Sequence, residues 1–216
     1  SNNISTSAGQ ITCGVHGTSG IQMINDGTFG TINSADLKLR TGATERARID
    51  TSGRLLIGHS SSVAASGNGF SLQNNGTAFA DSSGLFGRYS ADINGPTFAF
   101  SKSRNATLGG QTIVQDDDEL GKIRFYGSDG VDFNNFAAEI QAQVDGTPGA
   151  NDMPGRLVFK TTADGATSPT ERLRIDSSGN IGINEANPET LLHISNGDAN
   201  DGPIILIEGS GQNAAN

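Results

Sequence analysis

Residues 170–184 read TERLRIDSSGNIGIN, and this stretch determines the expected fold because residues 44–58, TERARIDTSGRLLIG, repeat its pattern. Nine of the fifteen positions are identical, at an offset of 126 residues. In the later copy the apolar residues share one parity, and they are Leu173, Ile175, Ile181 and Ile183. Side chains alternate between the two faces of a strand, so each copy predicts two short strands with one apolar face.

A turn separates the two strands in each copy. Ile175 and Asp176 precede Gly179 just as Ile49 and Asp50 precede Gly53. Asp and Ser side chains bond to the nearby backbone, and glycine accepts a positive φ. We therefore expect both glycines to adopt a positive φ, or to lie where a Cβ atom would clash. Two short strands cannot bury an apolar face alone, so the unit must pack on another part of the chain or on another copy of it.

Similar alternation occurs elsewhere and predicts an all-β chain of about ten short strands. The alternating runs are TFAFSK at 97–102, GKIRFYG at 121–127, AEIQAQV at 138–144 and RLVFK at 156–160, and an apolar run spans 204–207. No segment shows a helical apolar stripe. The repeats and turns suggest four segments: 1–60, 61–110, 111–195 and 196–216.

Composition excludes several classes of protein. Leu, Ile, Val and Phe make up only 47 of the 216 residues, while Gly accounts for 30 and Trp is absent. Such a chain is short of apolar area to bury, which oligomerisation can supply. The net charge of −9 opposes nucleic-acid binding. We expect no membrane insertion, because no run of 18 apolar residues occurs, and no intrachain disulfide, because Cys13 is the single cysteine.

Residues 111–195 resemble the shaft segments of bacteriophage tail fibres and related virion appendages. The similarity rests on QTIVQDDDELGKIRFYGSDGVDF, AAEIQAQVDGTPGANDMPGRLVFKTTADG, SPTERLRIDSSGNIGI and NPETLLHIS. The copy at 37–59 departs from the pattern at Leu56 and His59. The resemblance implies an intertwined, parallel, homotrimeric β fibre. Segments of this family often precede a self-cleaving chaperone domain, and we expect any such domain to follow Asn216, in a longer protein.

Candidate binding chemistry is sparse. The acidic run Asp116–Glu119 could hold a cation, but it also suits a solvated turn. Cys13 and His16 could bind a metal only if a threefold axis tripled them, and we expect no metal. His59 and His193 are isolated, and packing explains His193 best. The charged positions around each repeat fit either a solvated face or pairing between protomers that fixes register, and they are Glu45, Arg46, Arg48, Asp50, Glu171, Arg172, Arg174 and Asp176.

These observations predict a structural component of a phage tail fibre, located on the virion, with no catalytic residues and no cofactor. Its expected partners are two further copies of itself, other virion tail proteins and a host cell-surface receptor. One alternative is a glycan- or receptor-binding module of the same fibre. Another is a polysaccharide-degrading tailspike, which the lack of Trp and the presence of only two Tyr disfavour.

Overall fold

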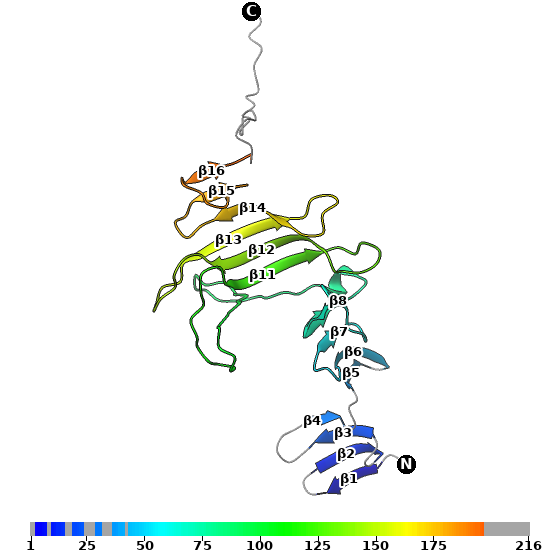
Figure 1. Ribbon diagram of the computed structural model, residues 1–216. Coiled ribbons are helices and arrows are strands. Elements are labelled where there is room, and N and C mark those ends of the chain that lie inside the picture. The colour runs from blue at the N-terminus through cyan, green and yellow to red at the C-terminus, as the bar shows by residue number, and fades with distance from the viewer. Residues whose placement is uncertain are drawn as a thin grey trace, which may run out of the picture. The chain divides into compact units, whose positions relative to one another are not determined.

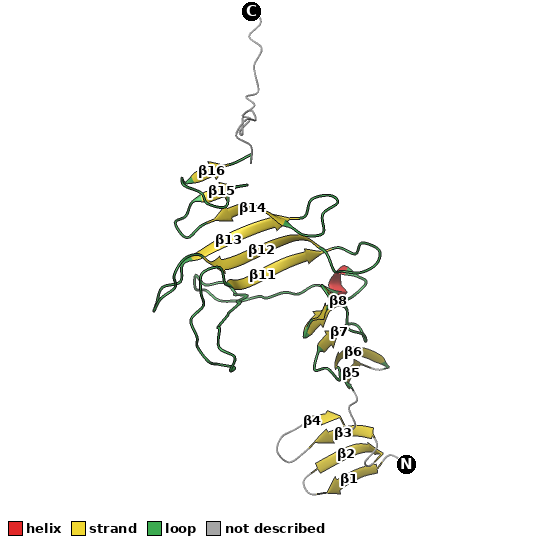
Figure 2. Ribbon diagram, viewed as in Figure 1, coloured by secondary structure: helices red, strands yellow, loops and turns green. Residues whose placement is uncertain are grey.

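The structure is a computed structural model that describes residues 3–7, 10–15, 19–23, 29–31, 36–41 and 43–196, with side chains described from residue 36 onward. These residues form short strands and one 3-10 helix, η1 (Phe79–Asp81), which confirms the all-β class (Figures 1 and 2). Within them, no helix has the length and apolar character needed to cross a membrane. The chain divides into two compact units, Ser1–Pro96 and Thr97–Asn216. The division into four segments stays a prediction.

The first unit contains two four-stranded sheets. The first is an antiparallel meander whose strands pair in chain order: β1 (Asn3–Ser7), β2 (Gln10–Val15), β3 (Ser19–Met23) and β4 (Phe29–Thr31). The second contains the earlier repeat and has the order β10-β7-β6-β5. Its strands are β5 (Leu37–Thr41), β6 (Thr44–Ile49), β7 (Leu55–Ile57) and β10 (Leu72–Asn74). A small hairpin, β8 (Ala64–Ala65) and β9 (Asn68–Gly69), lies between β7 and β10 in the chain.

The second unit is built on one six-stranded sheet whose strands also pair in chain order (Figure 1). All neighbours are antiparallel except the last pair, which is parallel. The strands are β11 (Glu119–Tyr126), β12 (Phe136–Val144), β13 (Gly155–Thr161), β14 (Thr170–Ile175), β15 (Ile181–Ile183) and β16 (Leu192–Ile194).

The two repeats pair their strands in the same register. Arg48 lies opposite Leu56 in β6 and β7, and Arg174 lies opposite Gly182 in β14 and β15. Each repeat also adds a fourth strand in parallel, β10 or β16. A β-bulge occurs at the corresponding place in both, between β5 and β6 and between β13 and β14. The similarity in sequence therefore extends to the hydrogen-bond pattern of the backbone.

The turns between the repeated strands follow the chemistry expected of them. Gly53 has φ +77° and Gly179 has φ +83°, while a Cβ atom at either would meet nothing within 4 Å. The Asp176 side chain accepts hydrogen bonds from the backbone N–H groups of Ser178 and Asn180, at 2.9 and 2.8 Å. The Asp50 carboxylate bonds to its own turn in the same way. The glycines are thus needed for their left-handed backbone and not for lack of space.

The strand expected at 97–102 is absent. Phe98 and Phe100 stack edge to face with ring centroids 5.0 Å apart, but their backbone pairs with no strand. The reason is that Phe100 packs on the face of β11 instead of beside its edge. A Cβ atom placed on Gly121, in β11, would come within 2.6 Å of the Phe100 Cβ atom. A segment that crosses the face of a sheet cannot hydrogen-bond along its edge. The apolar run at 204–207 lies outside the described residues.

Candidate functional site

Two rows of apolar side chains cross the six-stranded sheet on one of its faces, called here the apolar face. One row takes a residue in register from every strand: Ile123, Ile140, Phe159, Leu173, Ile183 and Ile194. The other row consists of Gly121, Ala142, Leu157, Ile175, Ile181 and Leu192. The four residues that parity assigned to one face of the later repeat all lie in these rows. That another chain covers them stays a prediction.

The apolar face is open in the single chain. Ile123 is 47% exposed, Leu192 53% and Ile175 38%. Within the described residues, the buried apolar side chains are few, and they are Leu56, Val114, Val144 and Val158. A sheet with one solvated face ordinarily turns its apolar face towards a core. The residues that the structure describes supply no such cover across most of the two rows.

The opposite face carries charged side chains that pair within the chain. Arg124 donates to the Glu139 carboxylate at 2.6 Å, and Lys160 lies 3.3 Å from its other oxygen. Glu139 is only 3% exposed, so both cations shield it from solvent. In β14, Arg174 donates to Glu171 at 2.6 and 2.9 Å, and this hydrogen bonding raises the pKa of the guanidinium. These partners belong to the same chain, so the ion pairs named here form without a second protomer. Whether this face also pairs with a second protomer stays a prediction.

The bulge in β14 interrupts the alternation at Arg172. Leu173 pairs with Phe159 and Glu171 with Lys160, which leaves Arg172 as the extra residue between them. Its Nε donates to Thr161 Oγ1 at 3.1 Å, and Thr161 shares a face with Phe159. The guanidinium therefore lies at the border of the apolar face, although simple parity places it on the charged face. Arg46 and Thr41 make the corresponding contact at 2.7 Å.

The earlier repeat has an apolar face of the same kind. Its two rows are Leu37, Ile49, Leu55 and Leu72, and Leu39, Ala47, Ile57 and Asn74. Leu72 is 66% exposed and Leu39 54%, so this face is open as well. On its other side Arg48 binds Glu45 at 2.5 Å, as Arg174 binds Glu171. Each unit thus presents an uncovered apolar face.

The acidic run Asp116–Glu119 is a turn whose carboxylates are already engaged. Asp118 accepts two hydrogen bonds from Arg104, at 2.7 and 2.8 Å, and these lower the pKa of the carboxyl to about 2. Asp117 adopts a left-handed φ of +67° and pairs with Arg156. A carboxylate held by a guanidinium has fewer lone pairs for a cation. The run therefore serves to fix the turn before β11.

The other candidate metal ligands do not gather. The side chain of Cys13 and all of His16 lie outside the described residues. His193 lies 3.9 Å from Glu185, and His59 is in the other unit. Across the described ranges, no group of three or more His, Cys, Asp or Glu side chains could hold a metal ion.

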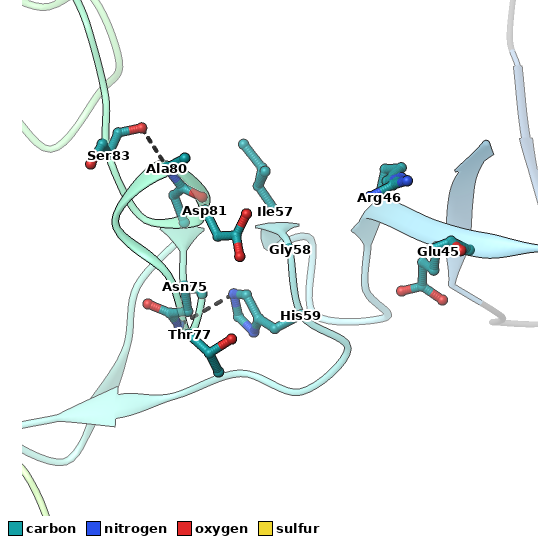
Figure 3. A pocket seen from close by; sticks show the side chains of 13 residues that line it. Glu45, Arg46, Ile57, Gly58, His59, Asn75, Thr77, Ala80, Asp81 and Ser83 are labelled. Carbon is teal, nitrogen blue, oxygen red and sulfur yellow. Dashed lines mark hydrogen bonds between the residues drawn. The ribbon is translucent and has the colours of Figure 1, made fainter.

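A polar pocket of about 740 Å³ opens in the first unit, beside β6, β7 and the loop that leads into η1 (Figure 3). Its lining residues are Thr44, Glu45, Arg46, Ile57, Gly58, His59, Asn74, Asn75, Gly76, Thr77, Ala80, Asp81 and Ser83. Two parts of the chain approach each other closely here. A Cβ atom placed on Gly58 would come within 2.7 Å of the Asn75 carbonyl oxygen, so this position requires glycine. The sequence pointed to three residues of this set, Glu45 and Arg46 as charged positions of the repeat and His59 as an isolated histidine, but to no pocket. The Asn-Asn-Gly stretch at 74–76 indicated only a turn.

The hydrogen bonds of His59 show which of its two ring nitrogens carries the proton. Nδ1 lies 2.6 Å from the Ser61 carbonyl oxygen and so donates to it, and Nε2 accepts from Asn75 Nδ2 at 3.3 Å. The Asp81 carboxylate accepts no hydrogen bond from any described residue, and Figure 3 shows it on the same side of the pocket as His59. Asn74 Oδ1 is buried without a partner. The pocket therefore offers one free acceptor, the Asp81 carboxylate, to hydroxyl or N–H donors.

The second carboxylate of the pocket is unsuited to acid catalysis. Glu45 is held by Arg48 at 2.5 and 2.9 Å, and this hydrogen bonding lowers the pKa of the carboxyl. A glycosidase acid needs a raised pKa and an unobstructed proton. The arrangement fits ligand binding better than hydrolysis.

Comparison with protein-family models and with curated proteins gives no match. Solved structures do match. The carboxy-terminal domain of the bacteriophage T5 L-shaped tail fibre aligns with a TM-score of 0.52 and 14% identity, over 84% of this chain and 74% of that chain. The same domain with its intramolecular chaperone domain aligns with a TM-score of 0.52 and 14% identity, over 96% of this chain and 57% of that one. The fold of this chain is therefore similar to that of a phage tail fibre domain.

Proposed function

We propose that this chain is a structural segment of a phage tail fibre that assembles as a parallel homotrimer through its apolar faces. The open apolar face across all six strands of the second unit carries the proposal. The fold likeness to a tail fibre domain supports it. The segment's role is mechanical: as part of the virion it joins other tail proteins to a region that meets the host surface. No step in this role requires catalysis.

The sheet is arranged so that a trimer can form a continuous core. Both apolar rows run from strand to strand, in the direction in which the six strands stack. Three such faces turned towards a common axis place six parallel rows inside and the charged faces outside. Apolar burial then stabilises the assembly, and the charged surface keeps the fibre soluble.

Native mass spectrometry of the chain tests this proposal. We expect a species of three times 22.2 kDa that persists in 1 M salt, because an apolar interface is not screened. A folded monomer that resists proteolysis, with no trimer, would contradict the proposal that three chains share one apolar core.

A second candidate function is recognition of a surface glycan by the polar pocket. The free Asp81 carboxylate favours it, since a sugar hydroxyl is a donor that satisfies such an acceptor. Titration calorimetry with glucose, galactose and N-acetylglucosamine should detect binding that Asp81→Ala weakens at least tenfold. Asp164→Ala, a change in an exposed loop of the other unit, is the control. Equal heats from parent and Asp81→Ala would remove this function.

A further inference from the structure

The segment 84–96, called here the connector, is the last part of the first unit and directly precedes the second unit in the chain. Hydrogen bonds within the segment, and not an apolar core, order it. Arg88 pairs with the Asp92 carboxylate and donates to the Asn94 carbonyl oxygen at 2.8 Å. Asp92 also accepts the Asn94 N–H at 2.9 Å and the Ser90 hydroxyl at 2.9 Å. These bonds order the loop 88–94 internally. A preformed loop loses little conformational entropy when it docks.

The large side chains of this connector are almost wholly exposed. Leu85 is 87% exposed, Tyr89 97% and Ile93 101%. Scattered surface apolar residues are ordinary, but several on one ordered loop form a patch of the kind that marks an interaction site. Tyr is also a preferred anchor at interfaces, because it offers a large contact area with few rotatable bonds.

An apolar cavity lies on the apolar face of the second unit. It has a volume of about 340 Å³ and is lined by Phe100, Leu120, Gly121, Lys122, Ile123, Ile140, Ala142 and Leu157. Phe100 forms part of its wall and belongs to the stretch that directly follows the connector. The chain therefore leads from the exposed loop straight onto the face that meets neighbouring copies in the proposed trimer.

We propose that the connector of one copy docks on a second copy, with Tyr89 and Ile93 in the apolar cavity beside Phe100. This inference rests on the proposed trimer. Each chain then gives one loop and receives one, a head-to-tail contact that closes into a ring under rotational symmetry. The exchange covers apolar side chains of the connector and the edge of the apolar face in one step.

Disulfide trapping between separately tagged chains tests the exchange. In a Cys13→Ser background, one chain carries Ile93→Cys and the other Ala142→Cys, and the two are co-expressed and oxidised. We expect a covalent dimer that contains both tags in most of the assembled material. The matched control replaces Ile93→Cys by Asp164→Cys, at an exposed position outside the connector, and should give at least tenfold less cross-linked dimer.

Three outcomes separate a failure of the proposed loop exchange between copies from a failure of the proposed trimer. Trimers that give no mixed-tag disulfide overturn the exchange and leave the trimer standing. A chain with both cysteines that forms only an internal disulfide shows that the connector docks on its own copy, which also overturns it. Absence of trimers from the parent on native mass spectrometry overturns the proposed function.

Discussion

Replacement of Ile175 by Asp places a carboxylate in the centre of the apolar face. In the single chain the side chain is already 38% exposed, so an isolated protomer would tolerate the change at modest cost. In the trimer the change removes the burial of an isoleucine, which contributes roughly 1.5–3 kcal/mol. It also buries an ion without a partner, which costs several kcal/mol more. The loss recurs in each of three chains and so exceeds the stability of about 5–15 kcal/mol typical of a folded domain.

We therefore expect Ile175→Asp to abolish the trimer at pH 7. Native mass spectrometry and size-exclusion chromatography with light scattering provide the measurement. Ala163→Asp adds the same charge in an exposed loop, and it should assemble and melt like the parent. If Ile175→Asp trimers formed and melted within 2 °C of the parent, the assignment of this face to a shared core would be refuted.

Two further predictions concern a turn and an ion pair. Gly179→Ala should lower the melting temperature, because a left-handed residue with a Cβ atom costs about 1–2 kcal/mol, whereas Ser178→Ala should not; equal melting of the two variants would contradict the role of φ +83°. Arg104 lowers the pKa of Asp118 from its ordinary 3.8 to about 2, so the pair stabilises the fold above about pH 4, and that stabilisation is lost as the pH falls through 2. Melting curves of the parent and Asp118→Asn should therefore converge between pH 5 and pH 2, and a gap that does not change with pH would refute this assignment.

Much of the fold follows from local pattern in the sequence. Alternation placed Leu173 and Ile175 on one face, and the registers of β14 and β15 agree, because the Asp-Ser-Ser-Gly turn returns the chain without changing which parity is apolar. Arg172 shows where this reasoning stops. A β-bulge adds one residue on one strand only, and the pattern of apolar and charged residues does not show it.

The polar pocket could not be predicted, because its residues come from separate parts of the chain. Arg46, His59 and Asp81 meet only after β6, β7 and the loop before η1 have packed together. The strand expected around Phe98 failed for a related reason. Two alternating aromatics fit a strand and an extended segment equally well, and only the contact with Gly121 distinguishes them.

Position 182 gives the most direct test of why the two repeats differ. Gly182 occupies the place that Leu56 has in the earlier repeat, opposite the arginine of the preceding strand. A Cβ atom on Gly182 would overlap the backbone carbonyl of Glu185, so the short connection from β15 to β16 crosses directly over the glycine. In the earlier repeat the connection from β7 to β10 is longer, and Leu56 is fully buried.

Gly182→Ala must therefore displace backbone, while its neighbours are held by the hydrogen bonds of the same connection. Ile181 N–H donates to the Leu191 carbonyl oxygen at 2.9 Å, and Asn180 Nδ2 donates to the Pro188 carbonyl oxygen at 3.2 Å. Overpacking of this kind costs about 1–3 kcal/mol, so we expect a clear fall in melting temperature and faster amide exchange in β16. Gly155→Ala is the matched control, since its Cβ atom would meet the Gln143 carbonyl oxygen at an ordinary 3.6 Å. If both variants melted alike, the length of the connection would have to be set by something other than the residue beneath it.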